Sequence, residues 1–193
     1  MSLVSAEIAK LSSNAYVTTK ISFANTLGAI CEKIPGADVD AISRALGADR
    51  RISPYYLKAG PAFGGPCFPR DNIAFRTFAK RFGLEAYLAV ATDKINDRQN
   101  ESLLKLIGRL IKQHRCSAVS VLGLSYKTNT PVIEEAPAVL IIQALLKRHP
   151  RLAINVYDPL ALENARRIFK DRIHYASSLE NCLARASLWL ITT

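Results

Sequence analysis

The pattern of apolar residues changes near residue 118, and this change limits the chain to a fold with two different parts. Up to about residue 95, apolar residues recur at the spacing of amphipathic helices. From residue 118 onward, short runs of consecutive apolar residues alternate with helical segments. Strands that alternate with helices pair in parallel, because each helix returns the chain to the same end of the sheet. The sequence therefore predicts an all-α domain, joined by a long helix to an α/β domain with a doubly wound parallel sheet.

The helical part is expected to hold four helices. Pro35 and Gly36 end the first, Asp38 is suited to cap the second, and Gly83 ends the third. The fourth is long and leads toward the sheet. The expected ranges are 5–32, 39–46, 69–81 and 85–113. These ranges place a helical domain at 1–95, a connecting helix at 96–117 and a sheet domain at 118–193.

The sheet part is expected to contain three strands, each a buried apolar run, separated by helices. The spacing between the runs leaves room for one helix per crossover, as parallel pairing requires. Because the chain stops on the last run, we expect a truncated sheet. The expected strands are 118–124, 152–157 and 186–192, and the expected helices are 137–148, 160–170 and 179–185.

Residues 60–71 concentrate the features of an active-site loop. Two adjacent glycines allow close backbone approach, and Cys67 stands two residues before Pro69, which suits the first turn of a helix. Cys67 would lie where free N–H groups and the helix dipole favour a thiolate. Asp71, one turn later, can share its side of the helix. A buried, inert cysteine after a Gly-Pro turn explains the same residues, and spacing alone leaves both interpretations open.

Composition excludes several classes of protein. The net charge of +10 suits an anionic partner such as a phosphorylated metabolite, but no basic run or aromatic-interleaved strand indicates a nucleic-acid surface. The four cysteines form no CxxC pair and the three histidines have no partner at ligand spacing, which disfavours a metal site and favours a reducing, cytoplasmic compartment. No apolar run has the length of a membrane span, and no signal peptide is recognisable.

The end of the first expected strand offers a second candidate site. Gly123 is followed by neither the G-x-x-G of the dinucleotide fingerprint nor a P-loop. Lys127 comes just after this strand, where open α/β sheets bind ligands. A solvated loop lysine accounts for Lys127 equally well.

Several short motifs occur in one known family in the same order. The loop at 62–71 is similar to its Gly-Phe-Gly-Gly-x-Cys-Phe-x-Lys-Asp loop, and 10–14 and 20–25 match its Lys-Leu-x-x-Asn and Lys/Arg-Ile-Ser-x-x-Asn helix motifs. Residues 96–99 match its Asn-x-x-Gln stretch, and 121–127 and 156–159 match the start of its C-terminal domain. On these motifs the chain resembles the UDP-glucose/GDP-mannose dehydrogenases over nearly its whole length.

The resemblance implies an enzyme that oxidises the C6 alcohol of a nucleotide sugar to a carboxylate, using two NAD molecules in succession. It implies that Cys67 captures the aldehyde as a thiohemiacetal, which becomes a thioester and is hydrolysed. Lys10 and Asn14 match the pair that stabilises the oxyanion and holds the water, and Asp71 matches the acid that orients or deprotonates that water. A homodimer is also implied, with an arginine that reaches the neighbouring subunit. Substrate contacts are implied at Arg51, Tyr56, Lys58, Gly64 and Lys127.

Three positions depart from the family's pattern, and one domain is missing. Pro66 replaces a serine before the cysteine, Arg70 replaces a lysine, and Glu134 replaces an arginine that contacts the cofactor. The family's NAD-binding Rossmann domain precedes the Lys10 helix and has no counterpart here. We therefore expect NAD to bind mainly outside this chain, and we expect no turnover by the chain alone.

The substrate and the catalytic role itself stay open at this stage. UDP-glucose is the preferred substrate, with GDP-mannose and N-acetylated UDP-hexosamines as alternatives. A non-catalytic dimerisation module with a structural Cys67 is a different class of function, and the net charge alone motivates a nucleic-acid-binding protein. Fast alkylation of Cys67 favours the enzyme over the module, and DNA retention with a steep salt dependence would favour the third class.

Overall fold

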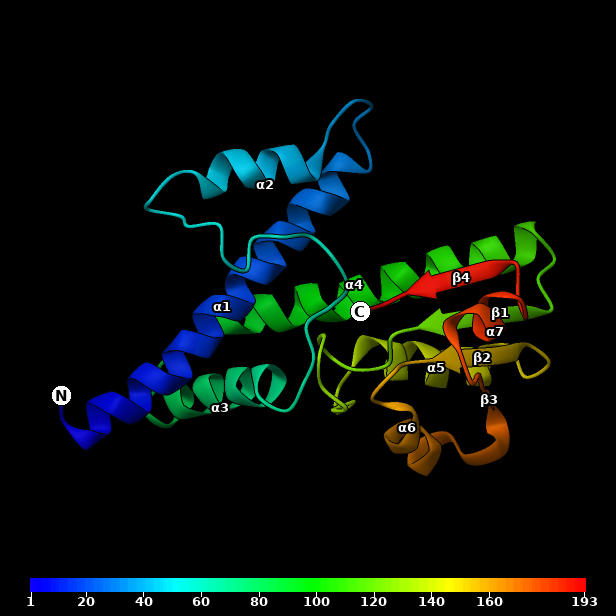
Figure 1. The fold of residues 1–193 in the computed structure, drawn as a ribbon. Coiled ribbons are helices and arrows are strands. Elements are labelled where there is room, and N and C mark those ends of the chain that lie inside the picture. The colour runs from blue at the N-terminus through cyan, green and yellow to red at the C-terminus, as the bar shows by residue number, and fades with distance from the viewer. The chain divides into compact units, whose positions relative to one another are not determined.

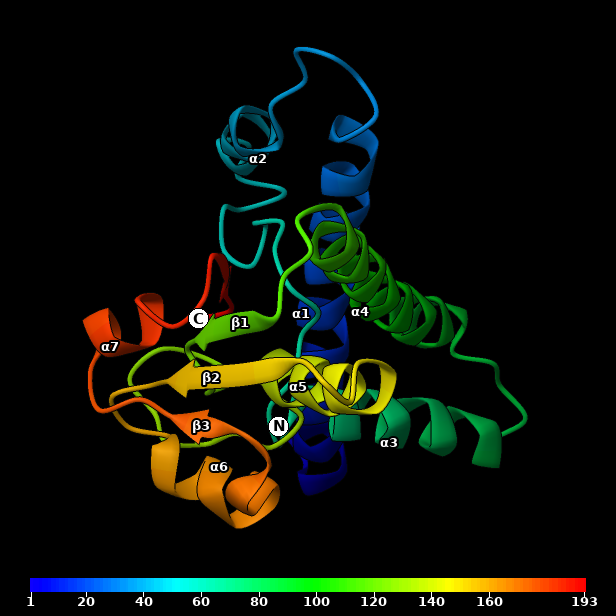
Figure 2. The same ribbon diagram turned by 90° about the vertical axis from the view of Figure 1, so that its right-hand side faces the viewer.

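The computed structural model describes all 193 residues of the chain, which divide into two compact units (Figures 1 and 2). The first unit comprises Met1–Phe63 and Cys67–Gln99, and the second comprises Gly64–Pro66 and Asn100–Thr193. The first unit is helical, and the second contains a parallel sheet with helices. The predicted combination of a helical region with a parallel α/β region is confirmed.

The helices of the first region lie within two residues of their expected bounds. Ser2 caps the first helix by accepting from the Ser5 N–H at 3.2 Å. Asp38 caps the second as predicted, because its Oδ1 accepts from the N–H groups of Asp40 and Ala41 at 2.8 and 3.1 Å. The helices are α1 (Leu3–Cys31), α2 (Val39–Gly47), α3 (Phe68–Arg81) and α4 (Tyr87–Gln113).

Buried polar side chains hold the helices of the first unit together. α3 lies along the N-terminal half of α1 (Figure 1). Asn72 on α3 donates to the carbonyl of Ala89 at 2.9 Å and to Asp93 Oδ1 at 2.6 Å, both on α4. The hydroxyls of Thr19 on α1 and Thr92 on α4 lie 3.2 Å apart. Because a buried polar group without a partner is costly, these pairs favour one arrangement of the helices.

The second unit contains a four-stranded sheet in the order β3-β2-β1-β4, in which every strand pair is parallel. β1 and β2 pair in register from Ala118 with Ala153 to Leu122 with Tyr157. Figure 2 shows α5 on one side of these strands. The strands are β1 (Ala118–Leu122), β2 (Ala153–Tyr157), β3 (His174–Tyr175) and β4 (Leu188–Ile191); the helices are α5 (Pro137–Arg148), α6 (Leu162–Phe169), the 3-10 turn η1 (Lys170–Arg172) and α7 (Leu179–Leu183).

The core of the second unit lies between the sheet and its helices. Val119, Val121 and Val156 of the central strands are fully buried, as are Ile142 of α5 and Phe169 of α6. The C-terminal half of α4 adds further apolar side chains to this cluster. None of the helices combines the length and the apolar content that crossing a membrane needs.

Two sequence expectations for the sheet were wrong. The first strand ends at Leu122 instead of residue 124, because Gly123 has a φ of +84° and turns the chain out of the sheet. β3 was not predicted at all, since its two residues, His174 and Tyr175, are too short a run to produce an alternating pattern.

Asp158, at the end of β2, is a buried carboxylate surrounded by main-chain donors. Its Oδ2 accepts from the N–H groups of Leu124 at 2.7 Å and Ser125 at 3.3 Å, and its Oδ1 accepts from those of Leu160 and Ala161 at 2.8 Å each. Burial raises the pKa of Asp158, but the four N–H groups outweigh burial and lower its pKa below the usual value. Asp158 therefore ties the turn after β1 to the turn after β2.

Asp158→Asn should destabilise the second unit by about 2–4 kcal/mol at neutral pH, because the new amide nitrogen faces main-chain donors. A lowered pKa contributes stability that is complete above about pH 4, the ordinary carboxyl value, and is lost as the pH falls through the folded-state pKa. Urea unfolding at several pH values should therefore show the gap between parent and variant closing in acid. Glu163→Gln, at an exposed acid of α6, is the control; equal stability of parent and Asp158→Asn would contradict this role.

Candidate active site

α1 and α3 bring three of the predicted catalytic side chains together in the first unit. Lys10 Nζ forms an ion pair with Asp71 Oδ2, and Asn14 Nδ2 donates to the same oxygen at 2.6 Å. Lys10 and Asn14 are one turn apart on α1, so both face the first turn of α3. The Asp71 side chain is 5% exposed, whereas that of Lys10 is 57% exposed. The group therefore combines a buried carboxylate, that of Asp71, with the solvent-accessible ammonium of Lys10.

The partners of Asp71 keep its carboxyl group ionised. Burial raises the pKa of Asp71, but the hydrogen bonds from Lys10 and Asn14, together with the positive charges of Lys10 and Arg70, outweigh burial and lower its pKa below the usual value. Arg70 Nε lies 3.8 Å from Asp71 Oδ1, the oxygen that the other two partners leave free. An anion held in this way can orient a water molecule and accept hydrogen bonds from it.

Cys67 occupies the N-cap position of α3, immediately before the helix. Pro69 lies in the first turn, as the sequence predicted, and the Asp71 N–H donates to the Cys67 carbonyl at 2.8 Å to close that turn. The Cys67 side chain is exposed, whereas Cys182 is buried. The interpretation of Cys67 as a buried cysteine is therefore wrong.

The two glycines before Cys67 pack closely against main chain and a ring of the second unit. A Cβ on Gly64 would overlap the carbonyl oxygen of Glu135, and one on Gly65, which has a φ of +84°, would overlap the ring of Tyr126. The Gly65 N–H donates to the carbonyl of Glu134 at 3.1 Å. Gly64 is therefore required for close packing against the main chain of Glu135. Glu134 contributes to the same contact through its main-chain carbonyl, which binds Gly65.

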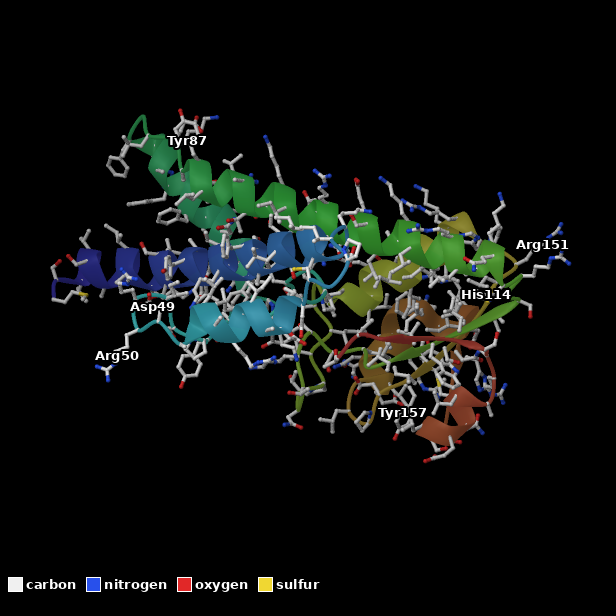
Figure 3. The ribbon with its side chains drawn as sticks, turned by 90° about the horizontal axis from the view of Figure 1, so that it is seen from above. Asp49, Arg50, Tyr87, His114, Arg151 and Tyr157 are labelled. Atoms are coloured by element: carbon white, nitrogen blue, oxygen red, sulfur yellow. The ribbon has the colours of Figure 1, made fainter.

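The residues expected to contact substrate belong to two different units. Arg51, Tyr56 and Lys58 lie in the first unit on the loop after α2, and all three side chains are exposed. Arg51 Nη2 pairs with Asp49 Oδ2 at 2.6 Å, and its neighbour Arg50 points away from the helices (Figure 3). Lys127 belongs to the second unit, where its Nζ lies 5.5 Å from the centre of the Tyr126 ring. The substrate roles of these residues stay predictions.

Three amide side chains contact the loop before Cys67, and no role was predicted for them although all three stand in the matched motifs. Asn25 lies on α1, and Asn96 and Gln99 lie on α4. Each bonds main-chain groups of residues 60–63. The available signal was their place in two of these motifs, the Asn that ends residues 20–25 and the Asn and Gln that bound residues 96–99.

The sheet of the second unit does not fit the pyrophosphate of NAD. In a dinucleotide site, free N–H groups after a strand and at the start of a helix bind the phosphates. Here the N–H groups of Gly123, Leu124 and Ser125 donate to the Tyr157 carbonyl and to Asp158, and α5 begins only at Pro137. No group of three or more His, Cys, Asp or Glu side chains could hold a metal ion.

Comparison with known proteins identifies the family. Residues 4–98 match the model of the central domain of the UDP-glucose/GDP-mannose dehydrogenase family, and residues 120–193 match that family's UDP binding domain. The UDP-glucose 6-dehydrogenase YwqF of Bacillus subtilis is 34% identical over 189 residues, which are 98% of this chain and 42% of that protein. The UDP-glucose 6-dehydrogenase AglM of Haloferax volcanii is 39% identical over 97% of this chain and 43% of its own length.

A solved structure gives the same result for the fold. The UDP-glucose dehydrogenase of the hyperthermophilic archaeon Pyrobaculum islandicum superimposes on 100% of this chain with a TM-score of 0.91 and 33% identity. The chain spans 44% of that protein, so it covers less than half the length of each of these relatives. With both domain models matched in order, the chain belongs to the UDP-glucose/GDP-mannose dehydrogenase family.

Proposed function

We propose that the complete protein oxidises the C6 alcohol of UDP-glucose to the carboxylate of UDP-glucuronate with NAD, and that Cys67 is its nucleophile. The observation that carries this proposal is the Lys10–Asn14–Asp71 group, which lies at the first turn of α3, the helix that directly follows Cys67. An exposed thiol, two hydrogen-bond donors and an ionised carboxylate are the parts that thioester formation and hydrolysis require.

The residues of this chain act mainly on the second half of the reaction. The Cys67 sulfur attacks the C6 aldehyde carbon, and the C–S bond forms while Lys10 and Asn14 donate to the oxygen that gains negative charge. NAD, when bound, accepts a hydride in each of the two oxidations. Asp71 then orients water and accepts its proton as the water oxygen attacks the thioester carbon, the C–S bond breaks, and Cys67 departs as a thiolate with its electron pair.

The exposed loop and the second unit provide the proposed nucleotide-sugar contacts. Arg51, Tyr56 and Lys58 would bind substrate from the loop after α2, Lys127 from the turn after β1, and Gly64 through its main chain. We further propose a cytoplasmic homodimer, a doubly wound sheet, and α4 as the helix that joins the two domains. The domain boundaries proposed from the sequence are 1–95, 96–117 and 118–193.

A kinetic screen of the complete gene product tests this function. UDP-glucose should give the highest kcat/KM with NAD, and two NADH should form for each acid produced. GDP-mannose and an N-acetylated UDP-hexosamine are the comparison substrates. Preference for one of these would correct only the sugar, whereas no acid from any of them would leave the non-catalytic module as the better function.

A further inference from the structure

Asn96 on α4 binds both polar main-chain groups of one loop residue. The Phe63 N–H donates to Asn96 Oδ1 at 2.8 Å, and Asn96 Nδ2 donates to the Phe63 carbonyl at 3.0 Å. A primary amide matches the donor and acceptor of a peptide unit only in this orientation, because the opposite one would place two donors and two acceptors face to face. Asn96 thus fixes the position and the direction of the main chain at Phe63.

Two more amides hold the same loop three residues earlier. The Gly60 N–H donates to Asn25 Oδ1 at 2.8 Å, and Gln99 Nε2 donates to the Gly60 carbonyl at 2.7 Å. Residues 60–63 belong to no helix or strand, so these side chains supply the partners that regular structure would supply elsewhere. Asn25 is only 2% exposed, which makes its hydrogen bonds expensive to lose.

Phe63, the residue that Asn96 binds, also contacts the start of α3. The rings of Phe63 and Phe68 meet edge to face, with their centres 6.3 Å apart at an angle of 84°. Phe68 directly follows Cys67 and is the first residue of α3. Phe63 itself is 9% exposed, so both its ring and its main chain are held. The chain is therefore fixed on each side of the short stretch that carries the thiol.

We propose that Asn96 is a positioning residue for Cys67. By binding both main-chain groups of Phe63, Asn96 fixes the position of the loop at Phe63. Because the Phe63 ring packs against that of Phe68, this contact in turn positions the residue next to Cys67. Gln99 supports the same loop from the next turn of α4. The effect on turnover rests on the function proposed above, whereas the hold on the loop does not.

Asn96→Leu in the complete gene product tests the proposal. Leucine has a similar size but neither donor nor acceptor, so the main chain of Phe63 loses both partners. Because a displacement of about 1 Å at a reacting atom can cost about 100-fold in rate, kcat for acid formation should fall about 100-fold while KM for UDP-glucose stays within about twofold. More aldehyde should escape to a carbonyl trap. Amide hydrogen exchange at Phe63 should accelerate about tenfold or more.

Thr92→Val is the matched control, because it removes a hydrogen bond made by another side chain of α4. The Thr92 hydroxyl lies 3.2 Å from that of Thr19 on α1, and the hydrogen bonds of Thr92 go to α1 and not to residues 60–63. Gln99→Met removes a single hydrogen bond to the loop and should give a smaller fall in kcat. It replaces Asn96→Leu as the test variant if Asn96→Leu does not fold. An equal fall in kcat for Thr92→Val, or an unchanged kcat in both loop variants, overturns the positioning role.

The exchange measurement separates this proposal from the proposed function. If the parent protein makes no acid from any sugar nucleotide, the enzymatic function fails but the hold on the loop is still measurable. Unchanged exchange at Phe63 in Asn96→Leu would then overturn the inference by itself.

Discussion

Cys67→Ser should abolish acid formation by the complete gene product while leaving a slow release of aldehyde. A serine hydroxyl is a far weaker nucleophile than a thiolate, so the covalent step should slow by about a thousandfold or more. The first oxidation does not need the covalent bond, so NADH should still appear at a low rate. The measurement is acid and trapped aldehyde from UDP-glucose, each followed separately.

Cys31→Ser is the matched control for this change. Cys31 is a free cysteine at the end of α1, and its replacement should leave acid formation unchanged. Iodoacetamide should label Cys67 faster than Cys116 or Cys182, and UDP-glucose should protect Cys67. Full acid production by Cys67→Ser would contradict the mechanism, because no other group proposed for the site can form the thioester.

Lys10→Met should lower kcat for acid formation by about 100–1000-fold, through loss of the strongest donor to the developing oxyanion. The same change removes the ion pair of Asp71, so the pKa of Asp71 should rise toward its ordinary value. As the pH is lowered, activity that needs ionised Asp71 would then be lost at a higher pH than in the parent protein. The pH dependence of kcat should therefore show an acid limb shifted upward.

Two variants distinguish a site effect from a general loss of positive charge. Lys33→Met removes an exposed lysine just beyond α1 and should leave both kcat and the pH profile unchanged. Lys10→Arg keeps the charge and should retain more activity than Lys10→Met. An acid limb that stays in place in Lys10→Met would show that Asp71 does not govern it.

Secondary structure could be predicted wherever local signals were strong. α5 has the bounds predicted for it, residues 137–148, and Pro137 suits its first turn while Lys147 and Arg148 suit its last. β1 was extended too far because Leu124 continues the apolar run, whereas its N–H is bound to a carboxylate 34 residues away. Short strands and turns of this kind depend on distant partners, which a local pattern does not contain.

The candidate site could be predicted only where its residues stand in recognisable motifs. Lys10, Asn14 and Asp71 were named together because they stand in motifs, although Lys10 and Asp71 are 61 residues apart. The hydrogen bonds of Asn96 with the main chain of Phe63 were not predicted, because the two residues are 33 positions apart and no spacing relates them. Packing of the long helices against the loop creates that contact, so only the three-dimensional structure displays it.

The turn after β1 has a consequence for how tightly an anionic ligand could be held there. The N–H groups of Gly123, Leu124 and Ser125 are already engaged, so a diphosphate at this end of the sheet would meet flexible side chains such as Lys127. Attraction between exposed charges is screened by dissolved ions within about 10 Å at 0.1 M. Affinity for an anionic ligand bound there should therefore decline as ionic strength rises, more steeply than in proteins that bind phosphate through main-chain amides.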